Sequence, residues 1–196
     1  YISATHLGGF IDTIYAGVIV YESYIDATIN IQNYLSEFTL KVGGLIAESD
    51  GGSILNSYSN SNIIVNVESE VLLIAGLVAE MKNYATISNS FSNVTYENNL
   101  GTAVEKIANI IDSTSVISNT YYFAGTSTTG GAGLNIATIT EESFVGFDFN
   151  NVWNFEGENK TPTIKSIKGT WDAQIETATI SFVGSGTKED PYLIQS

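Results

Sequence analysis

The stretch that decides the fold is Val42-Gly43-Gly44-Leu45-Ile46-Ala47, followed by Ile54-Leu55-Asn56-Ser57-Tyr58, because both of its parts recur along the chain. The first unit recurs as Leu7-Gly8-Gly9-Phe10, Ile74-Ala75-Gly76-Leu77 and, in degraded form, Ile107-Ala108-Asn109-Ile110. The second recurs as Val20-Tyr21-Glu22-Ser23-Tyr24, Ile87-Ser88-Asn89-Ser90-Phe91 and Ile117-Ser118-Asn119-Thr120-Tyr121. Two markers with steps of 30 to 35 residues predict one structural unit stacked four times.

The segments between these markers are typical of short β-strands. Residues 61–67 (Ser-Asn-Ile-Ile-Val-Asn-Val) and 23–31 are rich in β-branched residues, and Asp50-Gly51-Gly52 is typical of a turn. We therefore expect an all-β fold, a right-handed parallel β-helix (β-solenoid) of about four coils with a C-terminal β tail. The solenoid is expected at 1–124, a loop and a closing aromatic segment over its end at 125–170, and a β tail or the start of a next domain at 171–196.

Side-chain alternation in the second marker predicts which residues face inward. In residues 87–92 the odd positions carry Ile, Asn and Phe and the even positions are all Ser, so the odd set is expected inside. The expected ladders are an amide row, Asn56, Asn89 and Asn119, with Glu22 in the same place in the first repeat, and an aromatic row, Tyr24, Tyr58, Phe91 and Tyr121. Stacked amides can satisfy one another, and we interpret the aromatic row as core rather than as a platform for sugars.

The composition excludes several classes of function. The net charge is −14, and the seven cationic residues are all Lys and scattered, so nucleic acid is not an expected partner. The chain has no Cys, which excludes disulfides and thiolate metal sites. No apolar stretch is long enough for a membrane-spanning helix. Since the chain opens without Met, we expect it to be a mature or excised piece of something longer.

These residues resemble the GLUG-motif repeats of bacterial and archaeal surface adhesins, which also occur N-terminal to the catalytic parts of some immunoglobulin A proteases. The resemblance rests on residues 42–47 with 54–58 and on residues 75–79 with 87–91, and it extends to Trp153 and Pro162. It implies a β-solenoid, an extracellular location at the cell surface, and an adhesive or spacer role with no catalytic residues to carry over. The fourth copy departs from the pattern, since Asn109 stands where Gly is usual.

The tail Gly184-Ser185-Gly186-Thr187-Lys188-Glu189-Asp190-Pro191-Tyr192-Leu193-Ile194 is similar to the segment that opens the family's repeats. One interpretation is that the chain is cut from a tandem array at the start of the next domain. The other is that the tail completes the open first coil of a neighbouring copy, which would build a head-to-tail filament by strand addition.

A carboxylate follows each glycine unit at a similar distance, at Asp12, Glu48, Glu80 and Asp112. Four stacked carboxylates could bind Ca²⁺, the one metal ion that the sequence suggests. The alternative is that they are solvated turn residues whose repulsion is screened. No other cofactor is expected.

Catalysis is not expected. His6 is the one imidazole and has no nucleophile motif near it, and the adjacent pair Glu141-Glu142 would point to opposite faces of a strand. We therefore expect a non-catalytic structural or adhesive segment, whose partners are neighbouring domains or copies of the chain. The alternative is a module that binds glycans or a host protein through Tyr21, Tyr84 and Tyr96. Asn93 and Asn159 stand in glycosylation sequons.

Overall fold

The structure is a computed structural model that describes residues 6–32, 39–66, 72–98, 104–110, 112–123, 128–157, 159–165, 182–183 and 193–194. Contacts within the chain separate two compact units, Tyr1–Ile164 and Lys165–Ser196. Within the described residues there are β-strands and one short 3-10 helix, η1 (Glu141–Ser143), and no α-helix. The predicted all-β class is therefore confirmed.

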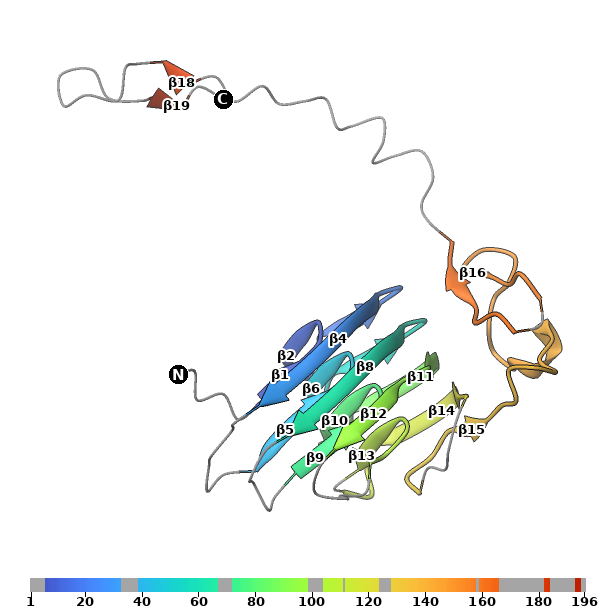
Figure 1. Cartoon of the computed structure of the whole chain (residues 1–196), viewed down its shortest axis with the longest axis horizontal. Coiled ribbons are helices and arrows are strands. Elements are labelled where there is room, and N and C mark those ends of the chain that lie inside the picture. Colours follow the sequence, from blue (N-terminus) through green and yellow to red (C-terminus); the bar gives the residue numbers. More distant parts are fainter. Residues whose placement is uncertain are drawn as a thin grey trace. The chain divides into compact units, whose positions relative to one another are not determined.

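Strands β1 to β15 of the first unit form three parallel sheets (Figure 1). The first sheet has the order β1 (His6–Gly8), β5 (Leu40–Gly43), β9 (Leu72–Ala75). The second has the order β13 (Ala108–Ile110), β10 (Val78–Lys82), β6 (Ile46–Asp50), β2 (Ile11–Tyr15). The third contains β3 (Ile19–Tyr21), β4 (Tyr24–Gln32), β7 (Ser53–Leu55), β8 (Tyr58–Asn66), β11 (Thr86–Ser92), β12 (Thr95–Asn98), β14 (Val116–Tyr122) and β15 (Ala132–Gly133). We call β1–β4, β5–β8, β9–β12 and β13–β14 repeats 1 to 4.

Equivalent positions of successive repeats are direct partners in these sheets. In the first sheet Leu7 pairs with Val42, and Val42 pairs with Ile74. In the third sheet Tyr24 pairs with Tyr58, which pairs with Phe91. Each repeat therefore contributes one layer, and side chains at the same position in the repeat lie side by side one strand spacing apart.

The fourth repeat is out of step with the expected alignment. Val78 pairs with Ala108, and the N–H of Leu77 donates to the carbonyl oxygen of Ile107 at 2.8 Å, so Ile107 lies opposite Leu77 and not opposite Ile74. The expectation that Asn109 replaces the family's Gly is therefore wrong, because Lys106 lies at that position. The sequence Ile107-Ala108 is identical to Ile74-Ala75, which favours a step of 33 residues. In the structure Val78 pairs with Ala108, a step of 30 residues.

The glycine pair of the first marker is required by a close approach of the backbone in successive repeats. A Cβ atom at Gly44 would lie 2.1 Å from the carbonyl oxygen of Gly76 and 2.5 Å from the Oγ atom of Ser59. Neither distance can accommodate a carbon atom, so only Gly allows the turn between β5 and β6 to pack against the next repeat.

The Asn of the second marker adopts a left-handed backbone conformation, with φ of 50° at Asn56, 47° at Asn89 and 43° at Asn119. Asn tolerates this region better than most residues. The strand direction changes there, so the alternation expected through residues 87–92 does not continue across Asn89. Ile87 and Ser90 are both fully buried, whereas Asn119 is exposed. Asn56 is buried, Asn89 is half-buried and Asn119 is exposed, so the inward direction predicted for the Asn row does not hold at Asn119. Nδ2 of Asn119 donates to Oδ1 of Asn89 at 3.3 Å, so one amide-to-amide bond of the predicted row is present.

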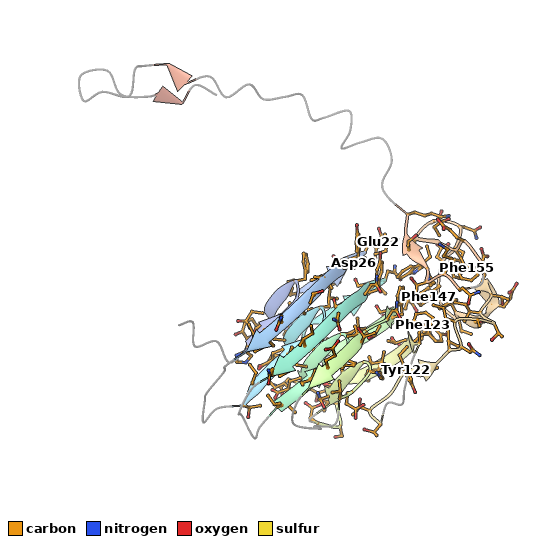
Figure 2. The ribbon with its side chains drawn as sticks, in the orientation of Figure 1. Glu22, Asp26, Tyr122, Phe123, Phe147 and Phe155 are labelled. Atoms are coloured by element: carbon orange, nitrogen blue, oxygen red, sulfur yellow. The ribbon has the colours of Figure 1, made fainter. Side chains whose placement is uncertain are left out.

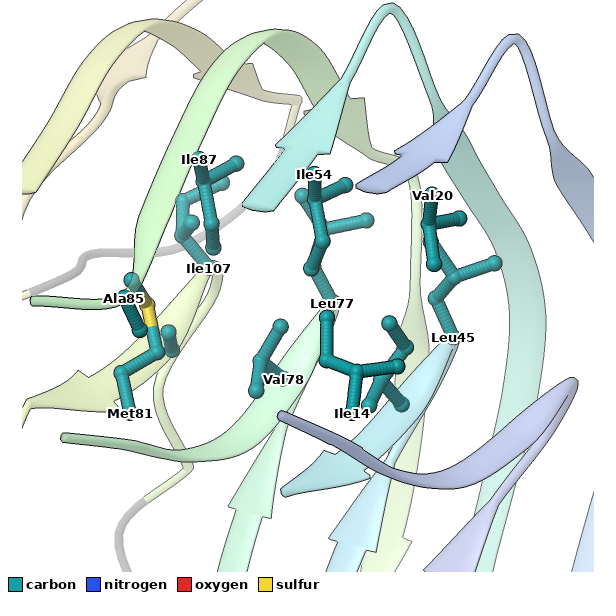
Figure 3. Close-up of a cluster of buried hydrophobic side chains, with 12 residues drawn as sticks. Ile14, Val20, Leu45, Ile54, Leu77, Val78, Met81, Ala85, Ile87 and Ile107 are labelled. Atoms are coloured by element: carbon teal, nitrogen blue, oxygen red, sulfur yellow. The ribbon is translucent and has the colours of Figure 1, made fainter. Parts of the chain in front are cut away.

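Two clusters of buried aliphatic side chains pack against the three parallel sheets. Figure 3 shows the first, in which Val20, Ile54 and Ile87 of the third sheet face Leu45 and Leu77 of the turns that precede β6 and β10. The second cluster contains Leu40, Val42 and Ile74 of the first sheet, together with Ile63 and Val65 of β8. Burial of these side chains supplies the hydrophobic driving force for stacking the repeats.

Parallel pairing continues past residue 124. Within residues 128–134, β15 pairs in parallel with β14, with Tyr121 opposite Ala132. The chain then forms η1 and a small antiparallel pair, β16 (Trp153–Asn154) with β17 (Thr163–Ile164). Residues 124–127, at the start of the expected loop, lie outside the described residues.

In the second unit the structure describes Lys165 and two short strands, β18 (Phe182–Val183) and β19 (Leu193–Ile194), which pair antiparallel. The remainder of the expected β tail at 171–196, including most of the segment 184–194, lies outside the described residues.

Replacing Asn89 by Ala should lower the free energy of unfolding by about 1–2 kcal/mol, because Ala is disfavoured in the left-handed conformation. Replacing Asn89 by Gly should cost less, since Gly adopts a positive φ without steric penalty. Urea denaturation of the three proteins measures both differences. Equal losses for Ala and Gly would contradict a backbone role for Asn89.

Candidate functional site

An aromatic row follows one outer face of the repeats, next to the Asn positions. The Tyr24 and Tyr58 rings stack with centroids 5.0 Å apart and planes 11° apart, and Tyr58 and Phe91 stack at 4.7 Å and 6°. Tyr121 lies opposite Phe91 in the register. Tyr58, Phe91 and Tyr121 belong to a third cluster, separate from the two aliphatic clusters, so the expectation that the row occupies an inner corner is wrong.

The aromatic segment covers this row. Trp153 is completely buried, and its ring centroid lies 6.1 Å from that of Tyr58 and 5.7 Å from that of Phe91. Phe147 stacks on Trp153 at 4.5 Å and meets Tyr121 edge-on at 5.6 Å. Figure 2 labels Phe147 among the side chains of this cluster. Because the contacts reach repeats 2, 3 and 4, the segment covers a lateral face, and the expectation that it closes only the end of the core is wrong.

The row is uncovered at repeat 1. Tyr24 is 57% exposed, whereas Phe91 is fully buried. Burial, together with the neighbouring Tyr24 and Asp26, raises the pKa of Tyr58 to about 12. One face of the Tyr24 ring is thus covered by the buried Tyr58 ring, and the opposite face is exposed.

Two polar rows run beside the aromatic row on the outer face of β4, β8 and the residues that follow β11. In the first row Nδ2 of Asn93 donates to Oδ1 of Asn60 at 2.8 Å, and Nδ2 of Asn60 donates to Oδ2 of Asp26 at 3.1 Å. In the second, Oγ1 of Thr95 donates to Oδ1 of Asn62 at 2.8 Å, and Asn62 pairs with Thr28.

These rows line an open cavity of about 500 Å³. We call it the polar groove; its lining residues are Asp26, Ala27, Thr28, Asn60, Ser61, Asn62, Asn93 and Thr95. All but Ala27 are polar. The groove is not among the sites expected from the sequence. Its one signal there is a polar residue, any residue and a second polar residue at 26–28, 60–62 and 93–95.

A second polar feature is a cluster of charges on β1, β5, β6 and β10. Glu48 and Glu80 are register partners and both are nearly buried. Lys41 contacts both carboxylates, at 3.0 Å for Glu80, and Lys82 also contacts both. His6 Nε2 lies 3.0 Å from Oε2 of Glu48. We call these five residues the charge cluster.

The charge cluster stabilises the ionised form of Glu48. Burial alone would raise the pKa of this carboxyl, but hydrogen bonds from Lys41, Lys82 and His6 outweigh burial and lower the pKa to about 2. The same carboxylates raise the pKa of Lys82. Two like charges one strand spacing apart are therefore neutralised by lysines of the chain itself.

The four carboxylates expected to stack behind the glycine units do not form one ladder. Thr13, and not Asp12, is the register partner of Glu48. Asp112 accepts hydrogen bonds from the backbone N–H groups of Asn83, Thr114 and Ser115, and these lower its pKa to about 2. In the part of the chain that the structure describes, no group of three or more His, Asp or Glu side chains could hold a metal ion.

The three tyrosines considered for binding differ in their surroundings. Tyr21 and Tyr84 are 51% and 74% exposed. Tyr96 is half-buried, its hydroxyl donates to the carbonyl oxygen of Glu105 at 3.2 Å, and Lys106 Nζ lies 4.6 Å from its ring centroid. Burial raises the pKa of Tyr96.

The two sequon asparagines also differ. Asn93 is half-buried and its amide nitrogen is part of the first polar row. Asn159 is exposed at a turn, with φ of 60°.

In the residues that the structure describes, no helix is both long and apolar enough to cross a membrane. A comparison of the chain with protein-family models, with curated proteins and with solved structures finds no match.

Replacing Glu48 by Gln should lower the free energy of unfolding at neutral pH by about 1–3 kcal/mol, because buried hydrogen bonds to Lys41 and Lys82 lose their charged acceptor. The pKa of Glu48 falls from 4.5 to about 2 on folding, so its contribution is present at neutral pH and disappears as the pH falls from 4.5 to about 2. The variant should therefore lose less stability across this range than the natural chain. Urea denaturation at several pH values measures the effect, with Glu97→Gln, at an exposed position, as control. Identical acid profiles for Glu48→Gln and the natural chain would contradict this role of Glu48.

Replacing Trp153 by Ala should lower the free energy of unfolding by about 3–5 kcal/mol, since the cavity would separate the aromatic segment from Tyr58 and Phe91. Trp153→Phe should lose less because part of the ring contact is kept. Chemical denaturation measures both. A midpoint unchanged by Trp153→Ala would show that the cover does not contribute to stability.

Proposed function

We propose that this chain is a non-catalytic structural segment of an extracellular cell-surface protein, built as a right-handed parallel β-helix. The observation that carries the proposal is the parallel register, which continues through four repeats in the second and third sheets and through three repeats in the first. Such stacking produces a stiff element without disulfides or bound cofactors. The right-handed sense follows from the strong preference of parallel strand connections for that hand.

The extracellular location is proposed from the GLUG-like markers at residues 42–58 and 75–91. A net charge of −14 keeps such a segment soluble and weakens its attraction to anionic surfaces. The charge cluster is consistent with a structural role, because its lysines and carboxylates are engaged with one another.

The edge of repeat 1 supports assembly with a neighbouring chain. Among the described strands, β1, β2, β3 and β4 each pair on one side only, with β5, β6, β7 and β8. Six of the nine large apolar side chains that the described residues expose also lie in this repeat: Phe10, Tyr15, Val18, Ile19, Tyr21 and Tyr24. Unpaired strand edges next to apolar side chains are the usual place for strand addition.

The opposite end of the repeats is covered by the chain itself. β15 pairs with β14, and Oγ1 of Thr129 donates to the carbonyl oxygen of Ala108. We therefore propose that the strand added to repeat 1 comes from the C-terminal unit of a neighbouring copy, residues 171–196, and not from its fourth repeat. Repetition of this contact would build a head-to-tail filament.

A binding module for a glycan or a host protein is the second candidate function. The exposure of Tyr21 and Tyr84 favours it. Loss of binding to a glycan array on Tyr84→Ala would support these tyrosines as the site, whereas retained binding would direct the search elsewhere on the surface.

The full chain should self-associate, so the mean mass from light scattering should rise between micromolar and millimolar concentration. Ile19→Lys, at an exposed position of β3, should shift the chain toward the monomer because a charge on the edge opposes strand addition. Tyr84→Lys, at an exposed position of repeat 3, is the matched control and should leave the association unchanged. A monomer at every concentration would contradict the filament.

A further inference from the structure

The polar groove presents hydrogen-bonding groups that the chain uses only in part. In the first polar row, each amide of Asn60 and Asn93 donates one N–H to its neighbour, and an amide nitrogen carries two. Within the described residues, Nδ2 of Asn62 and the hydroxyl of Thr28 have no hydrogen-bond partner. The groove therefore offers donors and acceptors side by side, at one strand spacing along each row.

The position of each donor and acceptor is set by the row itself. The hydrogen bonds from Asn93 to Asn60 and from Asn60 to Asp26 hold these side chains in one orientation and end on a carboxylate, which is an acceptor only. A ligand that binds here meets groups that are already ordered, so it loses little affinity to ordering them.

The chemistry of the groove selects among ligand classes. An apolar ligand would leave the amides and hydroxyls buried without partners, at a cost. An anionic ligand would approach Asp26 and a chain of net charge −14 without a cation in the groove lining. A neutral ligand rich in hydroxyl groups fits both constraints, because each hydroxyl both donates and accepts.

Tyr24 provides an apolar face beside these polar groups. Tyr24, Asp26 and Thr28 alternate along β4 and so project from the same face of the sheet as Asn60 and Asn62 of β8. Its ring is 57% exposed and is held by the stacked ring of Tyr58. The open face of the Tyr24 ring is the one turned away from Tyr58. The C–H face of a terminal sugar ring packs on it beside Asp26 and Thr28, and the next sugar units extend along the groove toward Asn60 and Asn93.

We propose that the polar groove and the Tyr24 ring form a binding site for a neutral linear glycan, with Asn60, Asn62 and Asn93 as its hydrogen-bonding residues. The site is distinct from Tyr21 and Tyr84. Tyr24 lies at the edge of repeat 1, so a strand added there would compete with the glycan for this ring, whereas Asn60, Asn62 and Asn93 lie in later repeats. The glycan chain runs across the strands, so that successive sugar units meet successive repeats.

The first test uses the full natural chain. Isothermal titration calorimetry with cellohexaose, chitohexaose and mannohexaose should detect binding of at least one, and a hyaluronan hexasaccharide should bind more weakly because it is anionic. In NMR spectra of the ¹⁵N-labelled chain, the bound glycan should shift the side-chain amide signals of Asn60, Asn62 and Asn93. Absence of binding by all three neutral glycans, or shifts confined to residues outside the groove, would overturn the proposal.

The second test uses matched variants. Asn62→Ala and Tyr24→Ala should each raise Kd about fivefold or more, which is the loss expected from one hydrogen bond or one ring contact. Tyr24→Phe should retain binding, because the ring face is kept. Thr86→Ala is the control, since it removes an equivalent cross-strand bond, to Ser53, outside the groove.

Unchanged affinity in both Asn62→Ala and Tyr24→Ala would overturn the proposal. If either variant fails to fold, the NMR shifts of the Asn60, Asn62 and Asn93 side-chain amides in the natural chain test whether the glycan binds in the groove. Asn62→Ala should leave the light-scattering mass unchanged, which separates the failure of this site from the failure of the proposed filament.

Discussion

The rest of the structure depends on one constraint, which is that each repeat must place its backbone directly beside the same residues of the previous repeat. Gly44 against Gly76 and the left-handed Asn at 56, 89 and 119 are the points where this constraint is most exacting. Once it is met, residues of the same kind stack. Aromatic rings then gain contact with one another, amides hydrogen-bond in rows, and carboxylates such as Glu48 and Glu80 repel unless a cation lies between them. Lys41 and Lys82 supply that charge.

The positions that report backbone constraints could be predicted from the sequence. Gly at a close approach and Asn at a positive φ leave a residue signature that does not depend on distant parts of the chain, so the register of repeats 1 to 3 follows from the markers. The register also brings Tyr24, Tyr58 and Phe91 together. What the same pattern could not indicate is the direction of the side chains, because strict alternation assumes a regular strand and Asn89 interrupts one.

The remaining differences have the same kind of cause. The sequence predicts the wrong alignment for repeat 4, because an apolar pair such as Ile107-Ala108 can be aligned with repeat 3 in more than one register. The hydrogen bonds between neighbouring strands distinguish these registers. The partners of Glu48 lie on three different strands, so no local motif identifies them. The sequence does not indicate the polar groove, because its residues, Asn, Thr and Asp, are also common in turns. They form a row of hydrogen-bonding groups only when three repeats place them side by side.

The way the aromatic segment reaches from Tyr58 to Tyr121 has a consequence for how such chains can vary in evolution. A stacked array ordinarily tolerates the duplication or loss of a whole unit, since each unit touches only its neighbours. Here Trp153 contacts Tyr58 of repeat 2, while Phe147, which stacks on it, contacts Tyr121 of repeat 4. An extra repeat between residues 58 and 121 would increase the distance between Tyr58 and Tyr121 and break one of these two contacts. Gene duplication can therefore add repeats before repeat 1 without loss of these contacts. The number of repeats that the aromatic segment covers, from repeat 2 to repeat 4, stays fixed.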